Sequence, residues 1–129
     1  MFSLDEVIHF HDVAIEQYGG SKGVRDFGSL DAALNRPWQT FDGEYLYPTS
    51  FTKAAAILES IILNLPFIDG NKRTAFFLCE TLLENNGFTI NADTESIYNF
   101  LIAVAVGASE FETLVKWLQQ NSHYTEQPT

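Results

Sequence analysis

The stretch "NLPFIDGNKRTAFF", residues 64–77, separates two apolar segments that predict the centre of the fold. Nearly every position from Thr52 to Leu65 is apolar, which is typical of a helix that is buried on all sides. A second buried helix is expected from about Lys72 to Asn86, with Gly87 at its C-terminal cap. The polar residues between the two segments are therefore expected in a loop whose ends are held by packed helices.

The residues of this loop suit a sharp turn into a helix. Pro66 ends the first helix, and the Gly70-Asn71 pair allows a tight turn before the second helix begins near Asn71. Lys72 and Arg73 then fall in the first helical turn, where unpaired N–H groups and the positive end of the helix dipole disfavour cations. Such a local conflict is expected at a functional site, and a bound anion resolves it.

A phosphate group is the anion that suits these residues. The N–H groups would cradle it, Lys72 and Arg73 would neutralise it, and Asp69 could hold the Mg²⁺ that accompanies a nucleotide. The alternative is a purely structural helix entry, in which Asp69 caps the helix and pairs with Arg73 four residues later. The spacing alone leaves both interpretations open.

The rest of the chain carries many helix signals and few strand signals. Residues 38–50 are interpreted as a loop with aromatic anchors or a short hairpin, and "FTI" at 88–90 is strand-like but too short to build a sheet. We predict an all-α fold, a compact bundle of about six helices forming one domain over residues 1–129, with a polar tail from about residue 122. Besides the two central helices, four are expected to begin at the Ser3–Glu6 capping box, at Ser29 before Pro37, at Asp93, and at the Ser109–Glu112 capping box.

Composition restricts the function classes. The chain has a net charge of −10, which argues against a nucleic-acid partner because duplex binding requires clustered Lys and Arg. Lys72-Arg73 is the one adjacent basic pair, and it suits one small anion better than a polyanion. The N-terminus lacks the features of a signal peptide, and no apolar run reaches the length of a membrane span. A cytoplasmic protein without a membrane partner is expected, with the lone Cys79 as a buried free thiol.

The segment "PFIDGNKRTA" resembles the signature of the Fic/Doc family, His-x-Phe-x-(Asp/Glu)-(Gly/Ala)-Asn-(Gly/Lys)-Arg. Lys72 matches the Doc branch, because Fic enzymes carry a second glycine at this position. The segment "FHDVAIEQYGGSKGVRDFGSLDAALNRPWQTF", residues 10–41, is similar to the N-terminal half of death-on-curing proteins. The two long motifs occur in the same order, so the resemblance covers nearly the whole chain.

The resemblance implies a small helical protein that transfers part of a nucleotide to a hydroxyl group on another protein. Doc-type members are expected to move the γ-phosphoryl group of ATP onto a translation elongation factor, whereas Fic enzymes move AMP. They are typically toxins of toxin–antitoxin pairs, neutralised by an antitoxin whose flexible tail folds onto them. Carried over to this chain, Gly70 and Asn71 would shape the anion hole, Lys72 and Arg73 would hold the phosphates, and Asp69 would bind Mg²⁺.

One position departs from the family pattern. The family's histidine lies two residues before the phenylalanine, here Phe67, and that position is Leu65. In the family the histidine is the general base that takes the proton from the target hydroxyl, and leucine has no group that can do so. The resemblance therefore predicts a Doc-type site that has its phosphate cradle but lacks its proton acceptor.

The other histidines offer no evident substitute. His9 and His11 are two positions apart and cannot face the same way on a helix, so we expect a structural role near the helix surface. His123 lies in the polar tail, where it is expected to be solvated. The Arg25-Asp26 pair in "VRDFGSL" also matches the family and is expected to fix the turn into the following helix.

Three functions remain open at this point. The first is a Doc-type toxin in which Leu65 is an inactivating change. The second is a natural pseudoenzyme that binds nucleotide or a partner without turnover. The third is an interaction module in which the loop is only structural.

Overall fold

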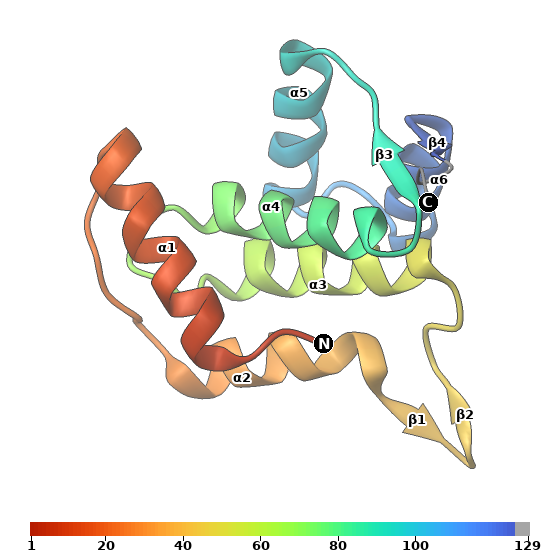
Figure 1. Ribbon diagram of the computed structural model, residues 1–129, viewed down its shortest axis with the longest axis horizontal. Helices are drawn as coiled ribbons and strands as arrows, with labels where there is room; N and C mark the ends of the chain where they lie inside the picture. Colours follow the sequence, from red (N-terminus) through yellow and green to blue (C-terminus); the bar gives the residue numbers. More distant parts are fainter. Residues whose placement is uncertain (126–129) are drawn as a thin grey trace.

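Two antiparallel helices, α3 (Ser50–Asn64) and α4 (Asn71–Glu84), lie side by side at the centre of the structure (Figure 1). The computed structural model describes residues 1–125. The burial of α3 explains its apolar sequence, since the run from Ala54 to Leu58 has no exposed surface. The three alanines at the start of that run are small enough to let neighbouring helices approach closely. The predicted pair of central helices is confirmed, with the connecting loop at residues 65–70. The predicted C-terminal cap at Gly87 is wrong, because α4 ends at Glu84 with Asn85 as its cap.

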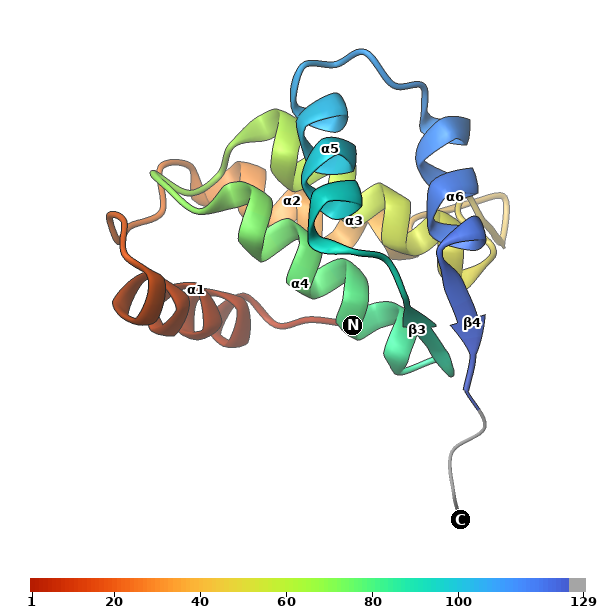
Figure 2. The ribbon, with the colours of Figure 1, turned by 90° about the horizontal axis from the view of Figure 1, so that it is seen from above.

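Four other helices surround this pair within residues 1–125, as the all-α prediction requires. Helices α2, α5 and α6 pack against α3, and α1 crosses one end of the bundle (Figures 1 and 2). A 3₁₀ turn, η1, follows α2 and contains the proline that ends it. The bounds are α1 (Leu4–Tyr18), α2 (Phe27–Asn35), η1 (Arg36–Trp38), α5 (Thr94–Ala105) and α6 (Phe111–Gln120).

Two of the predicted helix caps are confirmed. The Ser3 side chain accepts a hydrogen bond from the Glu6 N–H at 3.2 Å and begins α1. The Asp93 carboxylate accepts the Ser96 N–H at 2.7 Å and begins α5. Both caps satisfy N–H groups that the first helical turn leaves without a partner.

The other two predicted caps are wrong by one to three residues. Asp26, not Ser29, caps α2, because its carboxylate accepts both the backbone N–H and the hydroxyl of Ser29 at 3.0 Å. The cap of α6 is Glu110 rather than Ser109, and its side chain makes no capping hydrogen bond. An aspartate accepts hydrogen bonds more strongly than a serine, and this preference decides the start of α2.

Short strands appear in two places. Strands β1 (Thr40–Phe41) and β2 (Glu44–Tyr45) form the small hairpin that was one of the two interpretations of residues 38–50. Strand β3 (Phe88–Ile90) pairs in antiparallel fashion with β4 (Ser122–Tyr124), a partner that the sequence did not reveal. The first residues of the predicted polar tail are therefore part of the fold, with His123 exposed as expected, and residues 126–129 lie outside the described residues. Within residues 1–125, no helix combines the length and apolar character needed to cross a bilayer.

Candidate functional site

The site is built on the N-terminus of α4. Gly70 is the N-cap and has a left-handed backbone, with φ of 76°, that glycine adopts without strain. A Cβ atom at this position would lie 3.3 Å from Ile15 and 3.4 Å from His11, so space also favours glycine. No side chain caps the helix, and within residues 1–125 the N–H groups of residues 71–73 have no hydrogen-bond acceptor. These N–H groups leave the α4 terminus open to an anion.

The structural alternative for Asp69 is wrong in both of its parts. Its carboxylate does not cap α4, but accepts the N–H groups of Gly70 at 2.9 Å and Ser21 at 3.1 Å. In the described part of the chain Asp69 and Arg73 form no ion pair. The Arg73 guanidinium instead lies over the ring of Tyr18, 5.0 Å from its centroid. The basic residues of the first turn are therefore not explained by a carboxylate partner.

The Asn71 side chain closes the loop. It is 8% exposed, its Oδ1 accepts the Phe67 N–H at 2.9 Å, and its Nδ2 donates to the Phe67 carbonyl at 2.9 Å. Both backbone polar groups of Phe67 are thus satisfied inside the protein, where Phe67 itself is 1% exposed. Asn71 shapes the site by holding the backbone that precedes it.

His11 supports the same loop from α1, and its predicted place near the helix surface is wrong. It is 1% exposed, its ring stacks on that of Phe67 with centroids 3.9 Å apart, and its Nε2 lies 2.6 Å from the Asp69 carbonyl oxygen. Because a carbonyl oxygen can only accept, the Nε2–H group donates this hydrogen bond. His9, by contrast, is exposed. The predicted structural role of His11 is therefore confirmed, and this role is to support the site loop from α1.

Residues 19–26 run along the other side of the loop. The Gly20 backbone passes so close that a Cβ there would lie 2.7 Å from the Asp69 carboxylate, and Gly23 accepts the Ile68 N–H at 3.0 Å. Arg25 donates from its side chain to the carbonyls of residues 64 and 65. The prediction for the Arg-Asp pair is thus half right, since Asp26 fixes the turn into α2 while Arg25 contacts the site loop.

Leu65 has an uncommon backbone conformation at the C-terminal cap of α3. Its φ of 49° and ψ of 57° are left-handed, and its side chain is 50% exposed. Leucine lacks the short polar side chain that helps Asn, Asp or His adopt this conformation, so the residue is strained. Such strain in a loop suggests a position that is constrained by function.

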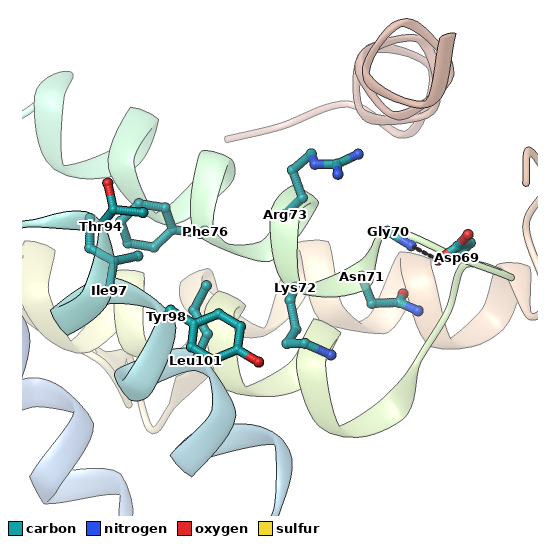
Figure 3. Close-up of a pocket in the computed structure, with 10 residues that line it drawn as sticks. All are labelled: Asp69, Gly70, Asn71, Lys72, Arg73, Phe76, Thr94, Ile97, Tyr98 and Leu101. Atoms are coloured by element: carbon teal, nitrogen blue, oxygen red, sulfur yellow. Dashed lines mark hydrogen bonds between the residues drawn. The ribbon is translucent and has the colours of Figure 1, made fainter. Parts of the chain in front are cut away.

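A cavity of about 620 Å³ opens between the α4 N-terminus and α5 (Figure 3). It has the volume of a small-molecule site. Five of the six predicted site residues line it, and Leu65 does not. The opposite wall is largely apolar, and the sequence did not reveal it because its only signal for α5 was the helix start at Asp93. The cavity is lined by Asp69, Gly70, Asn71, Lys72, Arg73, Phe76, Thr94, Ile97, Tyr98 and Leu101.

The two basic side chains lie on different sides of the first turn of α4. Figure 3 shows Arg73 directed toward α1, while Lys72 extends on the side of Tyr98. Both are exposed, and within residues 1–125 Lys72 forms no ion pair. The pair therefore surrounds the helix terminus with positive charge from two directions, which suits a group with several anionic oxygens.

Asp69 is the acidic residue of the cavity. In residues 1–125 no cluster of three or more metal-binding side chains occurs, so a cation here would need ligands from elsewhere. Mg²⁺ commonly binds one or two protein carboxylates and takes its other ligands from substrate phosphates and water. The exposed carboxylate of Asp69, which lines the cavity, fits that mode and does not fit a dedicated protein cage.

The chain is similar in sequence to known proteins. A family model described as "Fic/DOC family" matches residues 1–83. "Toxin Doc" of Mycolicibacterium smegmatis is 47% identical over 76 residues, and the match spans 59% of this chain and 58% of that relative's length. "Protein kinase doc" of Escherichia phage P1 is 28% identical over 121 residues, which is 92% of each chain.

Proposed function

The chain belongs to the Fic/DOC family, and from this premise we propose that it is a Doc-type toxin of a toxin–antitoxin pair, built to transfer a phosphoryl group from ATP to a protein hydroxyl. The observation that carries the proposal is the cavity at the α4 N-terminus, which is lined by Lys72, Arg73 and the start of a helix whose first N–H groups are uncapped. Phosphoryl transfer rests mainly on positioning and charge stabilisation, and these groups supply both.

The phosphate chain of ATP would bind at the α4 terminus. The free N–H groups donate hydrogen bonds, and Lys72 and Arg73 neutralise charge from two sides. Asp69 would hold Mg²⁺ together with phosphate oxygens, and the ion would neutralise further charge on the triphosphate. Asn71 and His11 keep the backbone of residues 67–69 in place, so the terminus is formed before the nucleotide binds.

The nucleoside would contact the apolar wall of the cavity. Phe76 of α4 and Ile97, Tyr98 and Leu101 of α5 offer one aromatic and aliphatic surface. Adenine presents a flat apolar face that can stack on an aromatic ring. The cavity therefore has a polar end for phosphates and an apolar end for a base.

Leu65 leaves this site without a general base. The carboxylate of Asp69 is engaged by two N–H groups and, in the proposed complex, by a cation, which makes it a poor proton acceptor. We therefore propose that the protein with Leu65 binds ATP and does not transfer its phosphate. The name of the phage relative favours phosphoryl over AMP transfer, and by the family resemblance the target would be a translation factor in the cytoplasm.

An antitoxin is the proposed macromolecular partner, and the name of the mycobacterial relative supports this part of the proposal. A second cavity of about 390 Å³ between α1 and α4 could accept apolar side chains of such a partner, since Phe10, Val13 and Phe77 line it. It shares Arg73 with the nucleotide cavity, so a partner bound there would also affect the phosphate site.

The experiment restores the base and labels the transferred group. We expect purified Leu65→His protein, with a translation extract, to produce a labelled protein band from γ-labelled ATP and none from α-labelled ATP. The unchanged Leu65 protein should give a signal about 10²–10⁴-fold weaker. Induced expression of Leu65→His should also arrest growth, and co-expression with the antitoxin should relieve the arrest.

Leu65→Asn is the matched control. Asparagine adopts the left-handed conformation more readily than leucine but is not a base at neutral pH. Transfer by Leu65→His but not by Leu65→Asn would assign the gain to proton acceptance. A folded Leu65→His protein that binds ATP and transfers nothing would refute the inactivated-toxin proposal and favour the pseudoenzyme.

A further inference from the structure

The left-handed backbone conformation of residue 65 requires stabilisation by contacts with other residues. Within residues 1–125, Leu65 and Asp42 are the two non-glycine residues with positive φ. Asp42 lies in the tight turn between β1 and β2, next to Gly43, where a short polar side chain suits the left-handed region. Leu65 has no such explanation, and a left-handed leucine costs about 1–2 kcal/mol. The surrounding structure must compensate for this cost.

Arg25 supplies contacts on both sides of the strained residue. Its Nε donates to the Leu65 carbonyl at 2.7 Å, and its Nη2 donates to the Asn64 carbonyl at 2.6 Å. The backbone N–H groups of Arg25 and Asp26 both donate to the Pro66 carbonyl, at 2.7 and 3.1 Å. Three successive carbonyls, at residues 64, 65 and 66, are thus fixed by two neighbouring residues of another segment.

The chemistry of this contact suits arginine in particular. The last carbonyls of a helix have no intrahelical partner and carry the negative end of its dipole, so a cation is favourable there. A planar guanidinium can donate two hydrogen bonds in fixed directions, which a lysine cannot do. Arg25 therefore stabilises the carbonyl geometry that the left-handed turn at Leu65 creates.

The segment that carries Arg25 is itself anchored. Asp26 caps α2, and Val24 forms an antiparallel bridge with Phe67 of the loop. Leu30 attaches α2 to the core with no exposed surface. The Arg25 guanidinium is thus attached to a packed element, although the side chain itself is exposed.

The other end of the loop is held by different groups. Asn71 bonds both backbone groups of Phe67, and His11 bonds the Asp69 carbonyl. Neither contact involves Arg25, and Arg25 does not line the cavity. The segment of residues 19–26 lies along the whole loop, but within residues 1–125 the Arg25 side chain donates only to the carbonyls of residues 64 and 65, apart from the side chains that hold the phosphate site.

From this separation, and resting on the proposed function, we propose that Arg25 is a positioning residue for the transfer step. It holds residue 65 in the left-handed conformation, and so orients the side chain at the position of the family's general base. It does not contribute to nucleotide affinity, which depends on the α4 terminus and on the contacts of Asn71 and His11.

The kinetic test uses the Leu65→His background. Adding Arg25→Ala should lower kcat for phosphoryl transfer by about 10–100-fold, since a small misplacement of a reacting group has effects of this size. The KM for ATP should stay within about twofold of its starting value. The kcat of the Arg25→Lys variant should lie between those of the Leu65→His protein and the Arg25→Ala variant, because one of the two hydrogen bonds can be retained. Lys116→Ala, which removes one exposed charge on α6, is the control and should change neither constant.

A second measurement needs no activity. In the protein with Leu65, NMR should show that Arg25→Ala moves the backbone shifts and the HN–Hα coupling of residue 65 away from left-handed values, with the resonances of α4 unchanged. An unchanged kcat, a rise in KM that accounts for the loss, or unchanged residue-65 resonances would each overturn the proposal. If Leu65→His with Arg25 intact transfers nothing, the proposed function fails, and the NMR result alone decides the role of Arg25.

Discussion

Replacing Asn71 by alanine tests the contact on which the shape of the phosphate site depends. Its side chain is the hydrogen-bond partner of both the N–H and the carbonyl of Phe67, each at 2.9 Å and both inside the protein. A buried backbone group left without a partner costs about 1–3 kcal/mol, so two such groups cost about 2–6 kcal/mol together. The gain from alanine in a helix is below about 1 kcal/mol and does not offset this cost.

Urea unfolding followed by circular dichroism measures the predicted loss. With a slope of about 2 kcal/mol/M, Asn71→Ala should lower the midpoint by about 1–3 M without changing the slope. The urea midpoint of Asn71→Asp should lie between those of the parent and Asn71→Ala, because a carboxylate still accepts the Phe67 N–H but cannot donate to the Phe67 carbonyl. ATP affinity should fall in step with stability in both variants, since the backbone that leads into the α4 terminus is no longer held.

Asn99→Ala is the matched control for this prediction. Asn99 lies on α5, is exposed, and makes no side-chain hydrogen bond within residues 1–125. Its replacement should change the free energy of unfolding by less than about 0.5 kcal/mol. If Asn71→Ala is no more destabilising than Asn99→Ala, the two hydrogen bonds do not hold the loop and the account of the site is wrong.

Two further predictions concern charge. Lys72→Ala should weaken ATP binding by about 10–100-fold with an unchanged melting temperature, as expected for one charge-assisted contact. Arg73→Ala should also lower the melting temperature slightly, because it removes the contact with the Tyr18 ring. Equal ATP affinity for Lys72→Ala and the parent, measured by calorimetry, would contradict the phosphate assignment. The backbone N–H and then the hydroxyl of Ser29 lower the pKa of Asp26, so the cap of α2 is fully stabilising above the unfolded-state pKa and is lost as the pH falls through the lower folded-state pKa. The stability advantage of the parent over Asp26→Asn, followed by thermal unfolding, should therefore shrink below about pH 4 and vanish on further acidification, and an advantage that is independent of pH would show that the ionised cap is not responsible.

Local structure followed from the sequence because its causes are local. The caps at Ser3 and Asp93 involve side chains and N–H groups three residues apart, so neighbouring residues suffice to recognise them. The mostly apolar segment that became α3 indicated burial for the same reason, as did the position of Cys79, whose thiol pKa is raised by that burial. The motif at residues 67–73 indicated the site, because glycine and the basic pair act within one helical turn.

The sequence also determined the feature that distinguishes this protein from its family's pattern. Leu65 stands where the resemblance places a general base, and no fold can give an aliphatic side chain a proton-accepting group. The structure adds that the backbone at this position is left-handed, a conformation that histidine tolerates better than leucine. The sequence therefore showed that position 65 has no proton-accepting group, but it did not show the backbone strain at that position.

Only the tertiary structure showed what surrounds the loop. His11 and Asp69 are 58 positions apart, Arg25 and Leu65 are 40 apart, and the α5 residues of the cavity lie beyond α4. The sequence around these residues does not indicate the contacts. His11 in particular was expected near the helix surface, and only the packing of α1 against the loop buries it. Contacts across such separations depend on how the helices cross, which is decided by packing of the whole core and not by neighbouring residues.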